Sequence, residues 1–234
     1  MYIIRYTMLN KEFIKKQRHL MARKTKEEAL KTYHLLLDAA AELFSYQGIS
    51  HTTLLEIAKF TGMTRGAVYW HFENKEDVIK ALWERDAAPF FNIFIAKLTD
   101  EVSRQTDIRA DLYFKNTIKE MLRQVTQDPK NSQAIRITFN YFEATHHQTE
   151  LQTYLESKSD AVYQALVSAL THLHQQQLLH TQHSPEFIAG ALYSYLHGLI
   201  EVNLHLRMKK TDLTNDGDLL IDLFLNSFFV DNSL

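Results

Sequence analysis

Residues 53–77 of the chain read TLLEIAKFTGMTRGAVYWHFENKED, and this stretch decides the fold. Thr53 is placed to cap a short helix. Gly62 permits a tight turn, and Thr64 caps a second helix that ends near Phe72. Two short helices joined by such a turn, with another helix ahead of them, place a recognition helix in the major groove of DNA. The stretch therefore predicts a helix-turn-helix with its recognition helix at 65–71.

The predicted recognition helix has two faces. Val68 and Phe72 lie one turn apart and are expected to face the core of the module, whereas Arg65 and Tyr69 share a different face. An arginine in the first turn of such a helix can donate two parallel hydrogen bonds to O6 and N7 of guanine. We therefore expect Arg65 to read a base directly.

The other polar residues of the stretch are expected to hold the DNA backbone. Gly66 has no side chain to keep the helix away from the duplex, and Tyr69 and His71 can donate hydrogen bonds to phosphate oxygens. Helix N-termini favour phosphate because their amides are free. Taken singly, each residue also has a plain structural explanation as a cap, a packed ring or a solvated lysine. The predicted DNA contacts are Thr53, Thr64, Arg65, Gly66, Tyr69, Trp70, His71 and Lys75.

The rest of the chain is also predicted to be helical, which makes the fold all-α. The chain has only 6 Gly and 3 Pro, and it shows no hairpin signal between alternating strands. A first helix is expected over 27–48. A long fourth helix is expected from Asn74, with a kink where Pro89 removes a backbone donor. Further helices are expected near 107–126, 130–146, 149–177, 185–207 and 216–230.

This pattern divides the chain into three parts. Residues 1–22 are expected to be an N-terminal extension, either a disordered tail or a product of an early start codon. Residues 23–75 form the predicted DNA-binding domain, and residues 76–234 form a helical bundle for ligand binding and dimerisation. Residues 1–80 hold 13 Lys and Arg against 9 Asp and Glu, while the remainder holds 13 against 19. The basic end is the candidate for a polyanionic partner.

Composition excludes several other classes of site. The chain has no cysteine, so disulfides, thiolate metal sites and cysteine nucleophiles are excluded. No run approaches the roughly 18 to 20 apolar residues of a membrane span. We expect a cytoplasmic protein with no membrane partner, no catalytic residue, no cofactor and no metal.

Three runs carry a family resemblance: TLLEIA at 53–58, TGMTRGAVYWHF at 61–72 and NKED at 74–77. Together they closely resemble the DNA-binding signature of the TetR family. Residues 21–48 and the GLIE at 198–201 are similar to multidrug-efflux repressors of the AcrR and TtgR type. The resemblance is strong to about Trp83 and faint beyond. It implies a ligand-responsive repressor that binds a palindromic operator as a homodimer, with a ligand pocket in each regulatory domain.

Large aromatic rings in the middle of the chain either fill a core or line an apolar pocket. Near Phe142, the polar groups of Glu143 and His146 are candidates for orienting a small hydrophobic or cationic drug-like ligand. If a pocket exists, ligand binding is expected to shift the helix that contains Pro89 and to spread the recognition helices. The predicted ligand contacts are Phe91, Phe94, Phe114, Phe142, Glu143 and His146.

The last two helices carry more apolar surface than one face can bury, which favours dimerisation. The segment 187–206 is apolar around most of its circumference. A core-only explanation stays open, because an internal helix can also be apolar nearly all round. The second stripe consists of Leu219, Leu220, Leu223, Phe224 and Phe228.

Two other functions stay open at this point. A DNA-binding regulator or architectural protein without small-molecule induction would need the same helix-turn-helix. A helical-bundle metal enzyme would use some of the 12 histidines, and His197, Glu201 and His205 place three ligands on one helical face. No pair of Glu-x-x-His motifs supports that enzyme.

Overall fold

The computed structural model describes residues 2–100, 109–145, 148–180, 182–204 and 211–229, with residues 2–24 described by their backbone alone. Apart from one bridge between Leu179 and Phe229, the regular structure of these residues is helical, as the sequence predicts. The elements are α1 (Tyr2–Gln47), α2 (Leu54–Thr61), α3 (Arg65–His71), α4 (Lys75–Leu82), a π-helical segment η1 (Trp83–Ala87), α5 (Ala88–Thr99), α6 (Ala110–Gln127), α7 (Pro129–Ala144), α8 (Glu150–Gln175), α9 (Pro185–Leu204) and α10 (Leu213–Leu225).

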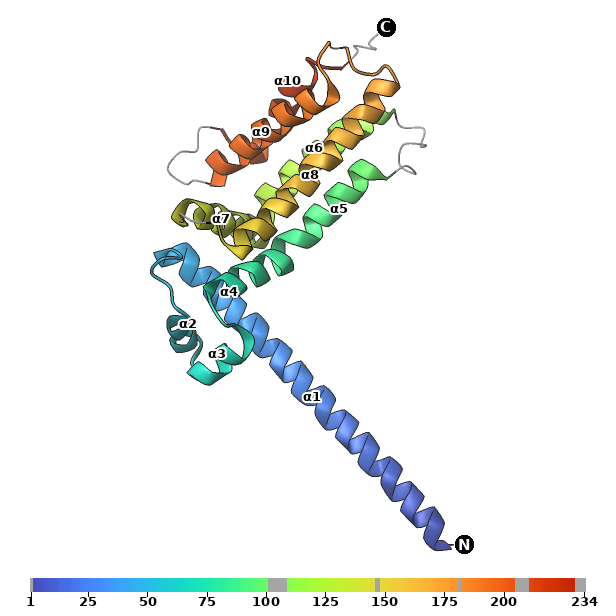
Figure 1. Ribbon diagram of the computed structural model, residues 1–234, viewed down its shortest axis with the longest axis vertical. Helices are drawn as coiled ribbons and strands as arrows, with labels where there is room; N and C mark the ends of the chain where they lie inside the picture. Colours follow the sequence, from blue (N-terminus) through green and yellow to red (C-terminus); the bar gives the residue numbers. More distant parts are fainter. Residues whose placement is uncertain (1, 101–108, 146–147, 181, 205–210, 230–234) are drawn as a thin grey trace.

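The helices form a small head and a larger bundle (Figure 1). The head consists of α2 and α3 beside the C-terminal part of α1, and α4 leads from it into the bundle of α5 to α10. Within the bundle, α8 packs against α5 and α9, and α10 packs against α6. Helix α4 contacts α1 as well as α7 and α8, and α1 also contacts α7, so both helices connect the head to the bundle.

Helix α1 begins much earlier than the predicted first helix. Its backbone is helical from Tyr2, and Figure 1 shows its N-terminal part extending away from the rest of the molecule. The physical reason is that residues 2–47 contain neither glycine nor proline, so no stop signal separates 1–22 from the helix that follows. No break in the helix marks the predicted boundary at residue 22.

The helix with a predicted kink at Pro89 changes its hydrogen-bonding pattern just before that residue. Residues Trp83–Ala87 form a π-helical segment, and the amide of Ala88 donates to the carbonyl of Trp83 five residues earlier. Pro89 then stands in the first turn of α5, where its missing N–H costs little. The π-helical segment η1 therefore separates α4 from α5 just before Pro89.

One apolar core runs through the head and the bundle. Buried side chains of α1 to α4, such as Leu37, Ile57 and Val78, belong to the same cluster as Ile118 and Leu166 of the bundle. A displacement in the bundle can therefore reach the head through packed side chains. Among the helices in the described ranges, none is long and apolar enough to cross a membrane.

Candidate nucleic-acid interface and ligand cavity

Local hydrogen bonds fix the two helices of the helix-turn-helix. The hydroxyl of Thr53 accepts from the amide of Glu56 at 3.2 Å, and the carboxylate of Glu56 accepts from the amide of Thr53 at 2.7 Å. These two bonds make a capping box. Gly62 has φ 69°, a left-handed conformation that glycine adopts without penalty, and Thr64 caps α3 through the amide of Ala67. The predicted boundaries of both helices hold to within a residue.

The cap changes what Thr53 can offer to DNA. Its one hydroxyl proton already goes to Glu56 Oε2, at 2.9 Å. The hydrogen bonds from Thr53 also hold the pKa of the Glu56 carboxyl below its ordinary value, so this acceptor stays ionised. A phosphate at this helix end would therefore be met by backbone amides of α2 rather than by the hydroxyl.

The recognition helix α3 turns the predicted core residues inward. Val68 is fully buried and Phe72 nearly so, and the ring of Tyr33 stacks on Phe72 with centroids 5.3 Å apart. The opposite face is open to solvent. Arg65 lies there with its guanidinium 5.0 Å from the centre of the Tyr69 ring. The ring holds the guanidinium in an outward position, where the edge of a base could be reached.

Three more predicted contacts surround this face. Trp70 is 72% exposed, which is unusual for its size. His71 is partly buried beside Tyr33, and burial lowers the pKa of its imidazole, so at neutral pH the ring is an uncharged donor. Lys75 Nζ donates to the carbonyl of Ile49 at 2.8 Å, and this bond ties the start of α4 to the turn before α2.

Gly66 offers a test of the predicted close approach to DNA. A Cβ at this position would meet only Thr64 Oγ1, at 4.0 Å. Gly66→Ala should therefore raise the free energy of unfolding by about 0.5–1 kcal/mol and at the same time weaken DNA binding. Gly190→Ala is the matched control, because a Cβ at Gly190 also meets nothing within 4 Å. We expect Gly190→Ala to stabilise the protein without weakening DNA binding. Urea unfolding measures the stability of both variants, and anisotropy titration measures their DNA affinity. Equal DNA affinity for both variants would contradict a close approach of DNA at Gly66.

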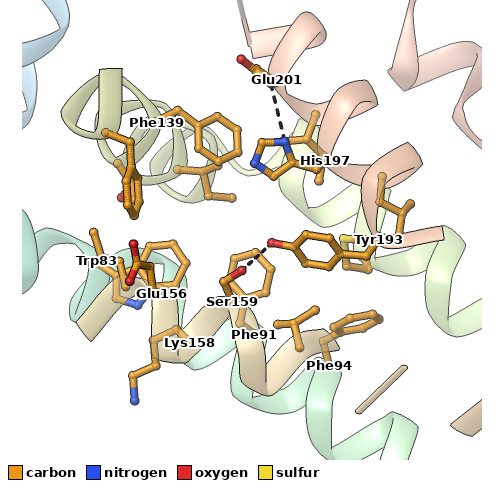
Figure 2. Close-up of a pocket in the computed structure, with 18 of the residues that line it drawn as sticks. Trp83, Phe91, Phe94, Phe139, Glu156, Lys158, Ser159, Tyr193, His197 and Glu201 are labelled. Atoms are coloured by element: carbon orange, nitrogen blue, oxygen red, sulfur yellow. Dashed lines mark hydrogen bonds and ion pairs between the residues drawn. The ribbon is translucent and has the colours of Figure 1, made fainter. Parts of the chain in front are cut away.

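The bundle encloses a cavity of about 400 Å³, within the range of small-molecule sites. Its wall combines aromatic and aliphatic side chains, and Trp83 of η1 stacks on Phe91 of α5 with ring centroids 5.4 Å apart. The indole Nε1 of Trp83 is buried and has no hydrogen-bond partner among the described residues. The labelled wall residues of Figure 2 are Trp83, Phe91, Phe94, Phe139, Glu156, Lys158, Ser159, Tyr193, His197 and Glu201.

Polar groups interrupt this apolar wall at three places. The hydroxyls of Ser159 and Tyr193 bond to each other across the cavity (Figure 2), which leaves one of their two protons for a ligand. His197 Nδ1 lies 3.6 Å from Glu201 Oε2. The Lys158 ammonium points out of the cavity and lies 4.9 Å from the centre of the Tyr154 ring. The cavity therefore combines a hydroxyl donor with carboxylates.

The structure brings together four of the six predicted ligand contacts. Phe91, Phe94, Phe142 and Glu143 line the cavity. Phe114 does not, because it is buried against Phe229 with ring centroids 6.1 Å apart. His146 lies outside the described residues. The predicted set lacks five other residues of the lining, because their rings or hydroxyls look like those of ordinary helical residues and His197 suggested only a metal ligand: Trp83, Phe139, Ser159, Tyr193 and His197.

A second hollow, of about 350 Å³, lies between η1, α5, α6 and α7. Phe94 and Met121 line both hollows and so stand between them. Two ion pairs lie on the wall of the second hollow: Lys97 with Glu120, and Arg85 with Asp86. The lining of this hollow is more polar and charged than that of the cavity beside Trp83 and Phe91, which is therefore the better candidate for the site of an apolar ligand.

The histidines do not assemble a metal centre in the described ranges, where no three His, Asp or Glu side chains lie close enough to hold an ion. His197 and Glu201 are neighbours at the cavity, but His205, the third residue of the predicted set, lies outside the described residues. The metal-enzyme alternative gains no support from these positions.

The predicted apolar stripe of α10 divides into two parts. Phe224 stacks on Tyr195 of α9 with centroids 4.7 Å apart, and Leu220 and Phe228 are also partly buried within the chain. Leu219 and Leu223, by contrast, are 72% and 74% exposed and lie one turn apart. The candidate dimer face therefore depends on these two leucines.

Known proteins resemble both parts of the chain. Residues 36–82 match the model for bacterial regulatory proteins of the tetR family, and residues 109–230 match the C-terminal region of MAATS-type transcriptional repressors. The chain is 31% identical to the transcriptional regulator AcrR of Shigella flexneri over 77% of its own length and 82% of that protein. It is 28% identical to the transcriptional regulator TtgR of Pseudomonas putida over 88% of its own length and 95% of that protein.

Solved structures agree with these sequence matches. A complex of SmeT with triclosan has a TM-score of 0.67 and 25% identity, and the alignment covers 87% of this chain and 94% of SmeT. SmeT is the repressor of the Stenotrophomonas maltophilia multidrug efflux pump SmeDEF. The family models together span the head and the bundle, and the proteins in question are transcriptional regulators rather than enzymes. This chain belongs to the tetR family of bacterial regulatory proteins, with a C-terminal region of the MAATS repressor type.

Proposed function

We propose that this protein is a cytoplasmic, ligand-responsive repressor that binds a palindromic operator as a homodimer and controls a multidrug efflux gene. The observation that carries the proposal is the cavity next to the helix that leads to the head. Trp83 lines this cavity and directly follows Leu82, the last residue of α4. A ligand that displaces Trp83 therefore acts on the connection between bundle and recognition helix.

Two features support the DNA-binding part. Arg65, Tyr69 and Trp70 are exposed on the face of α3 opposite the buried Val68. In a symmetric dimer, two such helices about 34–36 Å apart, or a multiple of that, would read the two halves of a palindrome. The exposed Leu219 and Leu223 of α10 are the surface through which we expect the dimer to form.

The ligand class follows from the chemistry of the cavity. Its aromatic and aliphatic wall suits a flat apolar body, and Glu143, Glu156 and Glu201 favour a neutral or cationic ligand over an anion. The hydroxyl pair of Ser159 and Tyr193 can donate to a ligand oxygen. Triclosan, an aromatic phenol that binds SmeT, is the first probe. Control of an efflux gene is inferred from SmeT and from AcrR-type relatives.

Filling the cavity tests the proposal. Val162 lines the cavity without a polar role, so Val162→Trp should occupy the ligand's space, and its operator affinity without triclosan is the baseline for the comparison. We expect triclosan to weaken operator binding by the wild type but not by the variant, in anisotropy titrations with labelled DNA. Ala161→Trp, an exposed position on the same helix, should respond like the wild type.

The same titration separates the competing functions. A regulator or architectural protein without induction would bind DNA with an affinity that no cavity ligand changes. A response to triclosan that persists in Val162→Trp would instead place the ligand outside this cavity.

A further inference from the structure

A chain of hydrogen bonds joins α7 and α8, two helices that line the cavity, to the start of α4. Tyr141 of α7 donates its hydroxyl proton to Glu76 Oε1 at 2.6 Å, and its oxygen also lies 2.7 Å from Thr149 Oγ1. Glu76 is in the first turn of α4, and Thr149 is the N-cap of α8. Three helices therefore meet at one tyrosine oxygen, which is on the boundary between bundle and head.

The direction of each bond follows from the number of protons. Tyr141 has one hydroxyl proton, and the carboxylate of Glu76 can only accept it. Thr149 must then donate its own proton to Tyr141, while Thr149 Oγ1 accepts from the amide of Gln152 at 3.1 Å. The chain runs from the first turn of α8 to Glu76. Burial and the bond to Glu76 raise the pKa of Tyr141, so the hydroxyl stays a donor at neutral pH.

Two of the three helices that meet at Tyr141 also line the cavity. Thr138, Phe139 and Phe142 of α7 face it, as does Ser159 of α8. Tyr141 itself is 4% exposed, is not part of the lining, and directs its hydroxyl to Glu76. A ligand that changes the spacing of α7 and α8 must stretch or release the bonds at Tyr141, because a hydrogen bond weakens steeply away from its best geometry.

Other polar contacts between bundle and head reach α1. Gln133 Nε2 donates to the Ala41 carbonyl at 3.0 Å in a part-buried position and to Ser45 Oγ at 2.9 Å. Arg85 of η1 pairs with Asp38 at 2.8 Å. These contacts hold α1 against the bundle, whereas the bond from Tyr141 reaches the first turn of α4. The charge-assisted bond from Tyr141 is part-buried and short. It is the contact whose loss should change α4 most.

We infer that Tyr141 is a positioning residue that couples the ligand cavity to the recognition helix through Glu76 and Thr149. This inference depends on the proposed function, because it assigns the ligand response to a particular contact. Glu76 follows Lys75, which starts the helix immediately after the recognition helix and its short turn. A shift of Glu76 therefore moves the first turn of α4, which lies only a few residues after the end of α3.

The test compares operator binding with triclosan absent and present. The ratio of the two dissociation constants measures the coupling. In Tyr141→Phe, which keeps the ring but removes the hydroxyl, we expect this ratio to fall toward one while triclosan affinity stays within about twofold. Glu76→Gln keeps an uncharged acceptor and should give an intermediate ratio. Tyr195→Phe is the matched control, because its hydroxyl bonds to the Leu220 carbonyl at 3.0 Å, inside the bundle. Its ratio should equal that of the wild type.

A ratio in Tyr141→Phe equal to that of the wild type would overturn the inference. If the wild type itself shows a ratio of one, the proposed function fails. Hydrogen exchange of the α4 amides then tests separately whether the Tyr141 contact links the bundle to the head. Faster exchange at residues 75–82 in Tyr141→Phe than in Tyr195→Phe would support the mechanical link between bundle and head. Equal protection in the two variants would rule it out.

Discussion

Arg65→Ala is expected to weaken binding to the operator by about 5- to 150-fold for each half-site that loses its contact, and to relax the preference for one base pair in each half-site. A bidentate contact between arginine and guanine contributes about 1–3 kcal/mol of discrimination. In the structure Arg65 is exposed and its guanidinium lies over the Tyr69 ring, so little further ordering is needed on binding. The measurement is a set of titrations against the operator and its single-base variants.

Two further substitutions make the Arg65 result specific. Lys75→Ala should weaken binding to operator and random DNA about equally and reduce the salt slope by about one per protomer, because a lysine at a helix N-terminus neutralises phosphate. Arg123→Ala removes a guanidinium that is paired with Asp218 in the bundle, and it should leave DNA binding unchanged. If Arg65→Ala and Lys75→Ala changed base preference equally, the division into base reader and backbone anchor would be wrong.

Combining Leu219→Glu with Leu223→Glu is expected to produce a monomer that no longer binds the palindrome with high affinity. Burial of a leucine contributes about 1.5–3 kcal/mol, and a twofold interface uses each leucine twice. Two carboxylates on each protomer would instead face their symmetry mates. Loss of the dimer removes one of two recognition helices, so operator affinity should fall by at least about 100-fold.

Sedimentation equilibrium measures this change directly. Leu112→Glu alters another exposed leucine, on α6, and should leave the dimer intact. A double variant that stays dimeric would show that the chains associate through another surface. A monomer with unchanged operator affinity would contradict the symmetric reading of a palindrome.

Much of the head could be predicted because its signals are local. The helix ends of the head are determined by hydrogen bonds to residues three or four positions away. These bonds involve the caps Thr53, Thr64 and Asn74 and the turn residue Gly62. Such bonds depend on sequence neighbours alone. The burial of Val68 follows in the same way from helical periodicity.

The cavity could be predicted only in part because it depends on how distant helices pack. Phe94 and Phe114 give the same signal in the sequence, yet one lines the cavity and the other packs against Phe229. The partner of a ring is decided by tertiary packing, which no local pattern records. The bond from Tyr141 to Glu76 spans 65 positions and was invisible for the same reason. The early start of α1 was not predicted because residues 2–24 carry no capping box that marks a helix start, and the lack of Gly and Pro is only weak evidence for a helix.

The most direct test of the central claim is a titration of the full-length protein onto a palindrome that it selects from a random DNA pool. Triclosan is added while tryptophan fluorescence reports filling of the cavity, with a Trp83→Phe variant, which keeps Trp70 of the recognition helix, as the reference for the Trp83 signal. We predict that filling the cavity raises the dissociation constant for DNA by at least about fivefold. A filled cavity with an unchanged dissociation constant would contradict the account.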